Sequence, residues 1–284
     1  MAIEIRNVSK RFGGTQALND VTLTFGENRI YGLLGNNGAG KSTLMNILSG
    51  RMESDSGSVT VDGIPVDKDA ALSRIFLQGE KNLFPETMKV RQAFDAAELF
   101  YPKFDRPSAE DFAKQFGLNL KQKITNLSTG YGSIFKLVLG LCVNTPYLLL
   151  DEPVLGLDAQ HRDLFYKLLL RKYADNPCTI VISTHLIAEV AGIIEHTVII
   201  REGCILKDAA TEELTADVCT ITGPSALLDG YLNGRTVLSE SVIGGLKTAC
   251  VQGTATQPLP AGLELSRVNL QDYFISLMNE EDRK

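Results

Sequence analysis

The stretch Gly35-Asn-Asn-Gly-Ala-Gly40-Lys41-Ser42 decides the fold of this chain. It fits the pattern G-x-x-x-x-G-K-[ST], it follows the apolar run Tyr31-Gly-Leu-Leu, and a helical pattern begins at Lys41. Glycines permit backbone conformations in which several N–H groups point at one anion, and a helix N-terminus adds positive potential there. The stretch therefore predicts a strand, a phosphate-binding turn and a helix in succession.

Each residue type in this P-loop, residues 35–42, suits contact with a nucleoside triphosphate. Lys41 provides a point charge for the outer phosphates, and the Ser42 hydroxyl provides a ligand for Mg²⁺. The sequence thus predicts ATP and Mg²⁺ as cofactors. The residues expected to line the phosphates are Gly35, Asn36, Asn37, Gly38, Ala39, Gly40, Lys41, Ser42 and Thr43.

Fully apolar strands alternate with helical patterns downstream of the P-loop. Residues 147–150, 179–182 and 198–200 are predicted strands, and residues 159–173 and 186–194 are predicted helices. Alternation of this kind indicates a parallel central sheet covered by helices on both faces. The predicted fold class is therefore α/β.

The helical pattern is densest at about residues 83–143, where apolar residues recur three and four positions apart. This region is predicted to be a helical subdomain. Its phenylalanines, with Phe94 and Phe100 among them, are expected in the helical core. The alternative is that they help form a groove for a partner beside Gln78.

The pattern changes again after about residue 211. Residues 216–284 carry Gly, Pro and Thr between short strand-like runs, and a helix is expected to begin near Asn269. No functional motif stands in this segment. It is predicted to be a small C-terminal α/β accessory domain, separate from a first domain at residues 1–210.

Two carboxylates end the apolar strand that leads to Leu150. Asp151 offers a hard oxygen ligand for a divalent ion, directly or through water. Side chains alternate along a strand, so Glu152 is expected to point the other way and to polarise an attacking water. His185 closes another buried strand at the same edge of the predicted sheet, where ligands bind in open α/β folds. Glu152 and His185 are thus candidate catalytic residues.

Composition excludes several classes of protein. The formal net charge of −6 and the absence of a Lys/Arg-rich run argue against nucleic acid as a partner. No window offers the roughly 18 consecutive apolar residues of a membrane-spanning helix. The five cysteines form no C-x-x-C pair, and Cys142, Cys178 and Cys204 are expected as core thiols in a reducing compartment.

Taken in order, these motifs resemble the ATP-binding subunit of an ABC transporter over about residues 2–210. Gln78, in F-L-Q-G-E-K, resembles the Q-loop of that family, Asp158 ends a D-loop-like L-G-L-D, and His185 stands where the family has its switch histidine. Phe12 falls where the family places an aromatic ring against adenine. The resemblance implies a P-loop ATPase with an antiparallel N-terminal β subdomain. It also implies that Gln78 is both a catalytic residue and a metal ligand, beside Ser42 and Asp151.

The segment Leu127-Ser-Thr-Gly130-Tyr131 lies where this family carries its signature L-S-G-G-Q. In the family, two ATPase subunits pair head to tail, and the signature of one covers the ATP on the other. The resemblance therefore implies that Ser128, Gly130 and Asp158 belong to the nucleotide site. Thr129 and Tyr131 depart from the family pattern. Degenerate signatures of the L-S-x-G type resemble a branch of bacterial exporters with separate permeases.

The function implied is ATP-driven transport, with export as the expected direction. The expected partners are a second ATPase subunit, identical or a close paralogue, and a separate transmembrane permease. The expected location is the cytoplasmic, inner face of the cell membrane. Two alternatives stay open from the residues: a soluble ABC-type ATPase that acts on nucleic acid or the ribosome, and a weakly hydrolysing, nucleotide-gated regulatory subunit.

Overall fold

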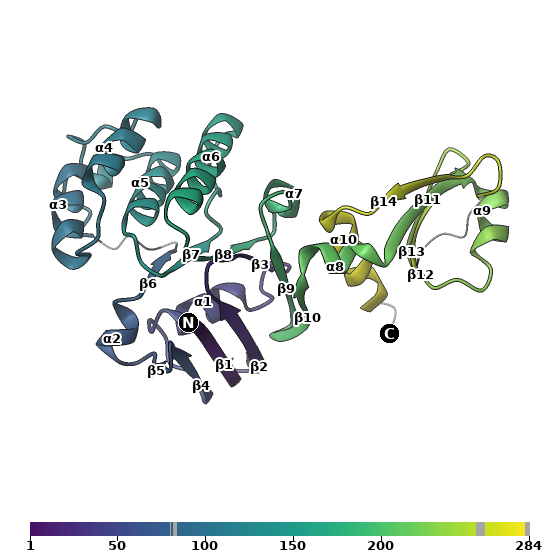
Figure 1. Cartoon of the computed structure of the whole chain (residues 1–284), viewed down its shortest axis with the longest axis horizontal. Helices are drawn as coiled ribbons and strands as arrows, with labels where there is room; N and C mark the ends of the chain where they lie inside the picture. The colour runs from purple at the N-terminus through teal and green to yellow at the C-terminus, as the bar shows by residue number, and fades with distance from the viewer. Residues whose placement is uncertain (80, 82–83, 254–258, 282–284) are drawn as a thin grey trace. The chain divides into compact units, whose positions relative to one another are not determined.

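The computed structural model describes residues 1–79, 81, 84–253 and 259–281. The chain divides into two compact units (Figure 1). Unit 1 contains residues 1–185 and 197–208, and unit 2 contains residues 186–196 and 209–284. Within the described residues, no helix has the length and apolar character needed to cross a membrane.

Unit 1 is built on a six-stranded sheet with the order β10-β9-β3-β8-β7-β6. The pairs β3–β8, β8–β7 and β7–β6 are all parallel. The two-residue turn at 202–203, with both residues at positive φ, joins β9 to β10, so this pair is antiparallel and the sheet is mixed. The strands are β3 (Ile30–Leu34), β6 (Ile75–Gln78), β7 (Tyr147–Asp151), β8 (Thr179–Thr184), β9 (His196–Arg201) and β10 (Cys204–Ala210).

A second sheet, at the N-terminus, has the order β2-β1-β4-β5 and is antiparallel throughout. One side chain in two is buried over much of β1 and β2, which is the pattern of strands with one face on a core. The strands are β1 (Ala2–Phe12), β2 (Thr15–Gly26), β4 (Ser56–Val61) and β5 (Ile64–Pro65).

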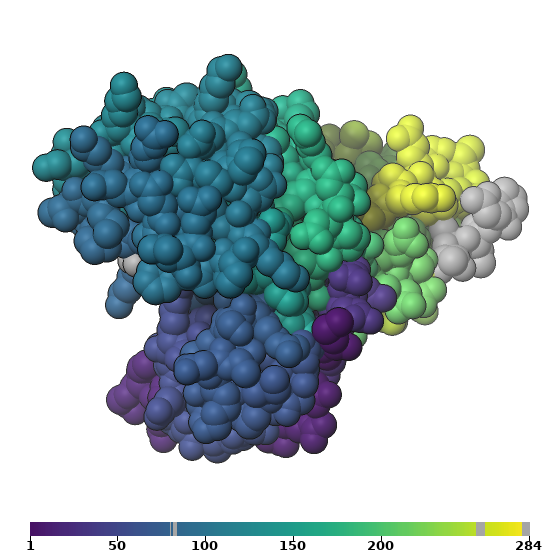
Figure 2. All heavy atoms as spheres, turned by 60° about the vertical axis from the view of Figure 1, so that its left-hand side comes forward, coloured from purple at the N-terminus to yellow at the C-terminus, as the bar shows by residue number. Residues whose placement is uncertain are grey.

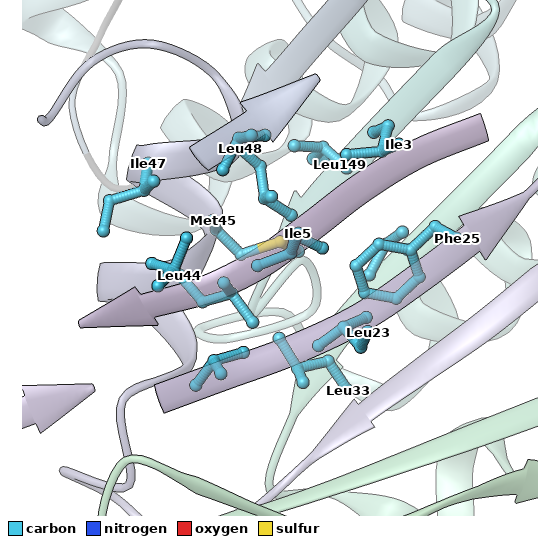
Figure 3. Close-up of a cluster of buried hydrophobic side chains, with 14 of the residues drawn as sticks. Ile3, Ile5, Leu23, Phe25, Leu33, Leu44, Met45, Ile47, Leu48 and Leu149 are labelled. Carbon is cyan, nitrogen blue, oxygen red and sulfur yellow. The ribbon is translucent and has the colours of Figure 1, made fainter. Parts of the chain in front are cut away.

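Helix α1 (Lys41–Leu48) begins at the P-loop and packs into the main core of unit 1 (Figure 3). Leu44, Met45 and Leu48 are fully buried against Ile5 of β1 and Leu149 of β7. Burial of each such side chain is worth about 1.5–3 kcal/mol, so this contact holds α1 firmly in place. The P-loop is thereby fixed between the end of β3 and the start of a packed helix.

The helices at residues 90–142 form the lobe coloured blue to teal in Figure 2, beside the N-terminal strands in purple and blue. Phe94 is fully buried there, as predicted. Phe100 is 74% exposed and Leu99 84% exposed, so the prediction of a core position for Phe100 was wrong. The buried face of α3 is set by Val90, Ala93, Phe94 and Ala97, and Phe100 is the last residue of the helix, beyond the buried part of that face. The helices and turns of unit 1 outside the sheets are α2 (Asp69–Leu72), α3 (Val90–Phe100), α4 (Arg106–Gln115), η1 (Ile124–Asn126), α5 (Thr129–Cys142) and α6 (Ala159–Asp175).

Three elements differ from the sequence prediction. The helix predicted for 186–194 is reduced to α7 (Ile187–Val190), because Gly192 weakens its continuation and Ile193 N–H turns back to the carbonyl of Val190. The strands β6 and β10 were not predicted, because β6 has only four residues and β10 shows no alternation of buried and exposed side chains.

All five cysteines are free. Cys142 and Cys178 are buried, as predicted for core thiols, whereas Cys204 is partly exposed and the prediction for it was wrong. Burial raises the pKa of the Cys178 thiol, which makes it a poor nucleophile.

Unit 2 contains a four-stranded antiparallel sheet with the order β12-β13-β11-β14. Its core joins Ile221, Ala249 and Val251 of the sheet to Leu228 of α9. The C-terminal helix α10 begins at Leu270, one residue after the predicted start. The elements are α8 (Thr211–Ala216), β11 (Val218–Pro224), α9 (Ser225–Leu232), β12 (Val237–Ile243), β13 (Leu246–Gln252), β14 (Glu264–Arg267) and α10 (Leu270–Glu281).

Candidate functional site

The P-loop forms a tight turn whose glycines fall into two kinds. At Gly40, with φ of 110°, an added Cβ would lie 2.5 Å from the backbone oxygen of Ala17. At Gly38, with φ of 82°, an added Cβ would meet nothing within 4 Å. Gly40 is also the N-cap of α1, and no side chain caps that helix. The first N–H groups of α1 are therefore available to an anion at the open side of the loop.

Lys41 is 5% exposed, and its ammonium lies inside the P-loop. Its Nζ donates to the carbonyl of Gly35 at 2.7 Å and lies 3.7 Å from Oε1 of Glu152. Burial lowers the pKa of Lys41, and attraction to Glu152 and Asp151 opposes that shift. The loop thus holds one cation between its own carbonyls and the acidic end of β7.

Glu152 is the centre of a polar cluster at the carboxyl edge of the sheet. Its Oε1 lies 2.9 Å from Nδ1 of His185, and its Oε2 accepts from Oγ1 of Thr184 at 3.2 Å. Glu152 has φ of 46°, outside the strand, so the strand-alternation argument for its direction was wrong. The backbone turns after Asp151, and this turn brings the Glu152 carboxylate to Lys41 and His185.

Asp151 ends β7, and its Oδ1 accepts a hydrogen bond from Oγ of Ser183 at 2.7 Å. Ser183 is fully buried, so this bond fixes the orientation of the carboxylate. The parallel pairing of β7 with β8 places Asp151 opposite Ser183. Two strands distant in sequence thus meet at this edge.

A cavity of about 520 Å³ opens beside these residues in unit 1. Ser42, Gln78, Asp151 and Glu152 line one part of it, and Ser128 lines another. The residues next to Ser128 in the sequence include no candidate base or metal ligand. In space, however, Ser128 shares this cavity with acidic and amide side chains of its own chain.

Three oxygens in this cavity fit a magnesium ion. Gln78 is 4% exposed, and its Oε1 is buried without a hydrogen-bond partner among the described residues. The Ser42 hydroxyl and the Asp151 carboxylate complete a set of hard oxygen donors. In the described part of the chain, no group of three or more His, Cys, Asp or Glu is placed to hold a metal ion. Magnesium does not need one, because it usually keeps several waters and takes few protein ligands.

Ser128 caps α5, and its Oγ accepts from the backbone N–H of Tyr131 at 3.3 Å. A Cβ at Gly130 would lie 3.2 Å from the carbonyl of Gly156, so the signature-like segment packs closely on the turn after β7. Asp158 caps α6 and accepts from His161 N–H at 2.9 Å. These three candidates therefore sit at two adjacent helix starts.

Phe12 lies at the end of β1, beside the turn to β2, and is 47% exposed. Lys10 Nζ is 5.7 Å from the centre of its ring. Exposure of a large aromatic ring suits a stacking surface for a base. The P-loop residues Asn36 and Asn37 are exposed too, whereas Thr43 is half-buried.

Sequence reasoning missed two cations at Gln78. Lys136 Nζ donates to the carbonyl of Gly79 at 3.0 Å, and Arg51 Nη2 donates to the carbonyl of Leu77 at 2.8 Å. The available signal was Lys136 itself, which is the single charged residue in the sequence of α5.

The sequence of this chain is similar to those of known ATP-binding proteins. Residues 18–155 match the family model described as ABC transporter. The ABC transporter ATP-binding protein YtrB of Bacillus subtilis (strain 168) is 32% identical over 189 residues, covering 66% of this chain and 65% of YtrB. The ribose import ATP-binding protein RbsA of Caldanaerobacter subterraneus subsp. tengcongensis is 30% identical over 229 residues, covering 76% of this chain and 46% of RbsA. The chain thus spans less than two thirds of the length of the first relative and less than half of the length of the second.

Two solved structures share the fold. An ATP-binding subunit of an ABC transporter superposes with a TM-score of 0.68 at 21% identity, covering 76% of this chain and 92% of that one. A dimeric ATP-binding cassette in a post-hydrolysis state with ADP and Pi superposes with a TM-score of 0.64 at 22% identity, covering 74% of this chain and 98% of that one. They confirm the predicted α/β fold with an antiparallel β subdomain. The sequence matches show that this chain carries a domain of the ABC transporter family over residues 18–155.

Proposed function

We propose that this chain binds and hydrolyses MgATP and that it powers a membrane transporter as a head-to-tail dimer. The observation that carries the proposal is the contact of Glu152 with both Lys41 and His185 at the mouth of the P-loop. It joins a phosphate-binding cation, a carboxylate base and an orienting histidine in one unit. A structural ion pair alone would not need the oxygen-lined cavity beside it.

In this proposal Lys41 leaves the carbonyls of the loop and binds the outer phosphates. Glu152 accepts a proton from the water that attacks the γ-phosphate, and ADP is the leaving group. His185 holds the Glu152 carboxylate through its Nδ1 contact, so the base is oriented before ATP arrives. Magnesium, when bound, would neutralise charge that develops on the phosphates. Ser42, Gln78 and Asp151 would hold it.

A second subunit would complete the site. Ser128, Gly130 and Asp158 lie at the N-termini of α5 and α6, where N–H groups and a helix dipole favour a phosphate. Ser128 is exposed, so a partner's ATP can reach it. Phe12 would stack on the adenine of the chain's own ATP.

A separate transmembrane permease would bind the helical region. Leu99 and Phe100 are exposed apolar neighbours at the end of α3, and such side chains favour a protein contact. Permease binding would bring the chain to the inner face of the cell membrane. Unit 2, which includes the whole predicted C-terminal domain 216–284, would act in assembly or regulation.

Export remains the proposed direction, on the basis of the L-S-x-G signature. The RbsA relatives are named import proteins. Reconstitution of this chain with its permease in inside-out vesicles tests the direction. In inside-out vesicles the lumen corresponds to the outside of the cell. ATP-dependent accumulation of substrate in the lumen would therefore support export, and ATP-dependent loss of substrate from the lumen would overturn it.

Complementation between two inactive variants tests the shared site. Lys41→Ala removes the phosphate cation, and Ser128→Arg fills the surface that meets the partner's ATP. Each variant alone should hydrolyse little ATP. Their mixture should recover part of the activity, because a mixed dimer has one intact site built from Lys41 of one chain and Ser128 of the other.

Two results would contradict the proposal. If Ser128→Arg abolishes ATP binding to the monomer, the signature assignment is wrong. If the wild-type chain with its permease binds ATP but turns over no faster than Glu152→Gln, the chain is a nucleotide-gated regulatory subunit and not a transport ATPase.

A further inference from the structure

The backbone on both sides of Gln78 is held by a cation. Arg51 donates to the carbonyl of Leu77 at 2.8 Å, and Lys136 donates to the carbonyl of Gly79 at 3.0 Å. The guanidinium of Arg51 also lies close to Gly79, since a Cβ added there would be 3.5 Å from its Nη1. Gln78 is thus the residue between two tethered carbonyls.

The two tethers come from different elements of unit 1. Arg51 lies in the turn just after α1 (Lys41–Leu48), the helix that begins with Lys41 of the P-loop. Lys136 lies in α5, the helix capped by Ser128. The backbone at Leu77 and Gly79 is therefore bonded both to the turn that follows α1 and to α5, the helix that starts at the signature-like segment.

Lys136 is an unusual residue for its place. The sequence of α5 is T-G-Y-G-S-I-F-K-L-V-L-G-L-C, in which Lys136 is the one charged residue among buried apolar neighbours. Lys136 is itself half-buried, and partial loss of water around an ammonium favours a hydrogen bond to a protein acceptor. The carbonyl of Gly79 supplies an acceptor.

Gln78 has the property that such tethers would serve. Its side chain is 4% exposed, and Oε1 has no hydrogen-bond partner among the described residues. The oxygen lines the cavity together with Ser42 and Asp151. A side chain with an unpaired oxygen has nothing of its own to orient it, so its position depends on the backbone that carries it.

We propose that Lys136 and Arg51 are positioning residues that hold Gln78 at the magnesium side of the cavity. The inference rests on the proposed function, since it takes MgATP as the ligand. Neither cation touches the ion. Each fixes a carbonyl next to Gln78, so loss of either tether lets the amide oxygen move away from Ser42 and Asp151.

Charge alone predicts the opposite result for Lys136. Among the described residues that line the cavity, Lys136 is the one cation, beside the acids Glu86, Asp151 and Glu152. Removal of a positive charge from this cavity would by itself favour Mg²⁺. A positioning role predicts weaker use of Mg²⁺ instead, so the direction of the change separates the two.

The test measures ATP affinity by isothermal titration calorimetry with excess Mg²⁺ and with EDTA, on the full chain. The ratio of the two affinities reports how much Mg²⁺ adds. Lys136→Met and Arg51→Met should lower this ratio by about 10-fold, the low end of what loss of a ligand-orienting partner costs. Affinity in EDTA should stay at the wild-type level. Lys136→Arg should restore the ratio because it keeps the donor, and the exposed Lys167→Met in α6 should leave it unchanged.

The outcomes separate this inference from the function it rests on. An unchanged or raised ratio in both methionine variants overturns the positioning role while ATP binding stands. Equal affinities in Mg²⁺ and EDTA for the wild type overturn it as well. If the wild-type chain binds no ATP, the proposed function itself is overturned. Should Lys136→Met fail to fold by circular dichroism, Arg51→Met carries the test by itself.

Discussion

Gly40→Ala should destabilise unit 1 more than Gly38→Ala, the alanine substitution at the P-loop glycine that faces open space. The new Cβ would lie 2.5 Å from the backbone oxygen of Ala17 and 3.0 Å from Cδ2 of Leu18. Real Cβ atoms do not approach backbone oxygens so closely. The oxygen belongs to β2, which is paired along its length with β1, so it cannot move freely.

Two costs add at this position. Gly40 has φ of 110°, and a residue with a side chain in such a region carries about 1–3 kcal/mol of strain. Relief of the contact with Ala17 by a backbone shift costs about another 1–3 kcal/mol, which is usual for overpacking in a core. The free energy of unfolding should therefore fall by about 2–6 kcal/mol.

Gly38→Ala is the matched comparison within the loop. Its φ is 82°, but the added Cβ would meet nothing within 4 Å, so only the backbone strain remains. The new methyl would stand on the open side of the loop, where the phosphates are proposed to bind. Gly13→Ala, with φ of 56° and open space around it, is the control outside the loop. It should lose a similar amount of stability and keep its affinity for ATP.

Thermal unfolding followed by circular dichroism measures the difference. For a unit of about 200 residues, each 1 kcal/mol lowers the melting temperature by about 2–4 °C. Gly40→Ala should melt at least about 2–4 °C below Gly38→Ala, which in turn should bind ATP more weakly than Gly13→Ala does. Equal melting temperatures for Gly40→Ala and Gly38→Ala would refute the packing argument, and equal ATP affinity for Gly38→Ala and wild type would refute the open-side argument.

Three further predictions concern charged residues. Lys41→Ala should weaken ATP binding at least about 10-fold in calorimetric titration while the chain stays folded, because a charge-assisted hydrogen bond worth about 1.5–3 kcal/mol is lost. Unchanged affinity for ATP would refute the proposed role of Lys41. Glu152→Gln should keep ATP bound, lose turnover and favour an ATP-bound dimer in gel filtration, and normal hydrolysis by this variant would exclude Glu152 as the base. Burial of Asp62 pushes its pKa up, but hydrogen bonds from Tyr147 and Arg74 outweigh that and hold the pKa below its usual range. A carboxylate with a lowered pKa adds stability that is full above its unfolded pKa of about 3.9 and is lost as the pH falls through its folded pKa. Urea unfolding below about pH 4 should therefore show a steeper loss of stability for wild type than for Asp62→Asn, and parallel pH curves would contradict this.

The parts of the fold that the sequence determined by itself are local ones. The P-loop could be predicted because a buried strand, a glycine-rich turn and a helix start stand within one short stretch, and their residue types act through their own backbone. The same holds for α1, whose end at Leu48 and positive φ at Gly50 match the predicted helix stop. Asp151 and His185 could be placed at one edge because each follows a continuous apolar strand, and parallel strands end together.

Tertiary structure decided what depends on contacts through space. The carboxylate of Glu152 reaches Lys41 because the backbone leaves the strand at positive φ, and no periodicity of the sequence encodes that turn. The bond from Lys136 to Gly79 joins residues 57 positions apart, and the unpaired oxygen of Gln78 is visible only once its surroundings are packed. Local propensity acts over a few residues, whereas the shape and charge of this cavity depend on which distant segments the two sheets and α5 bring together.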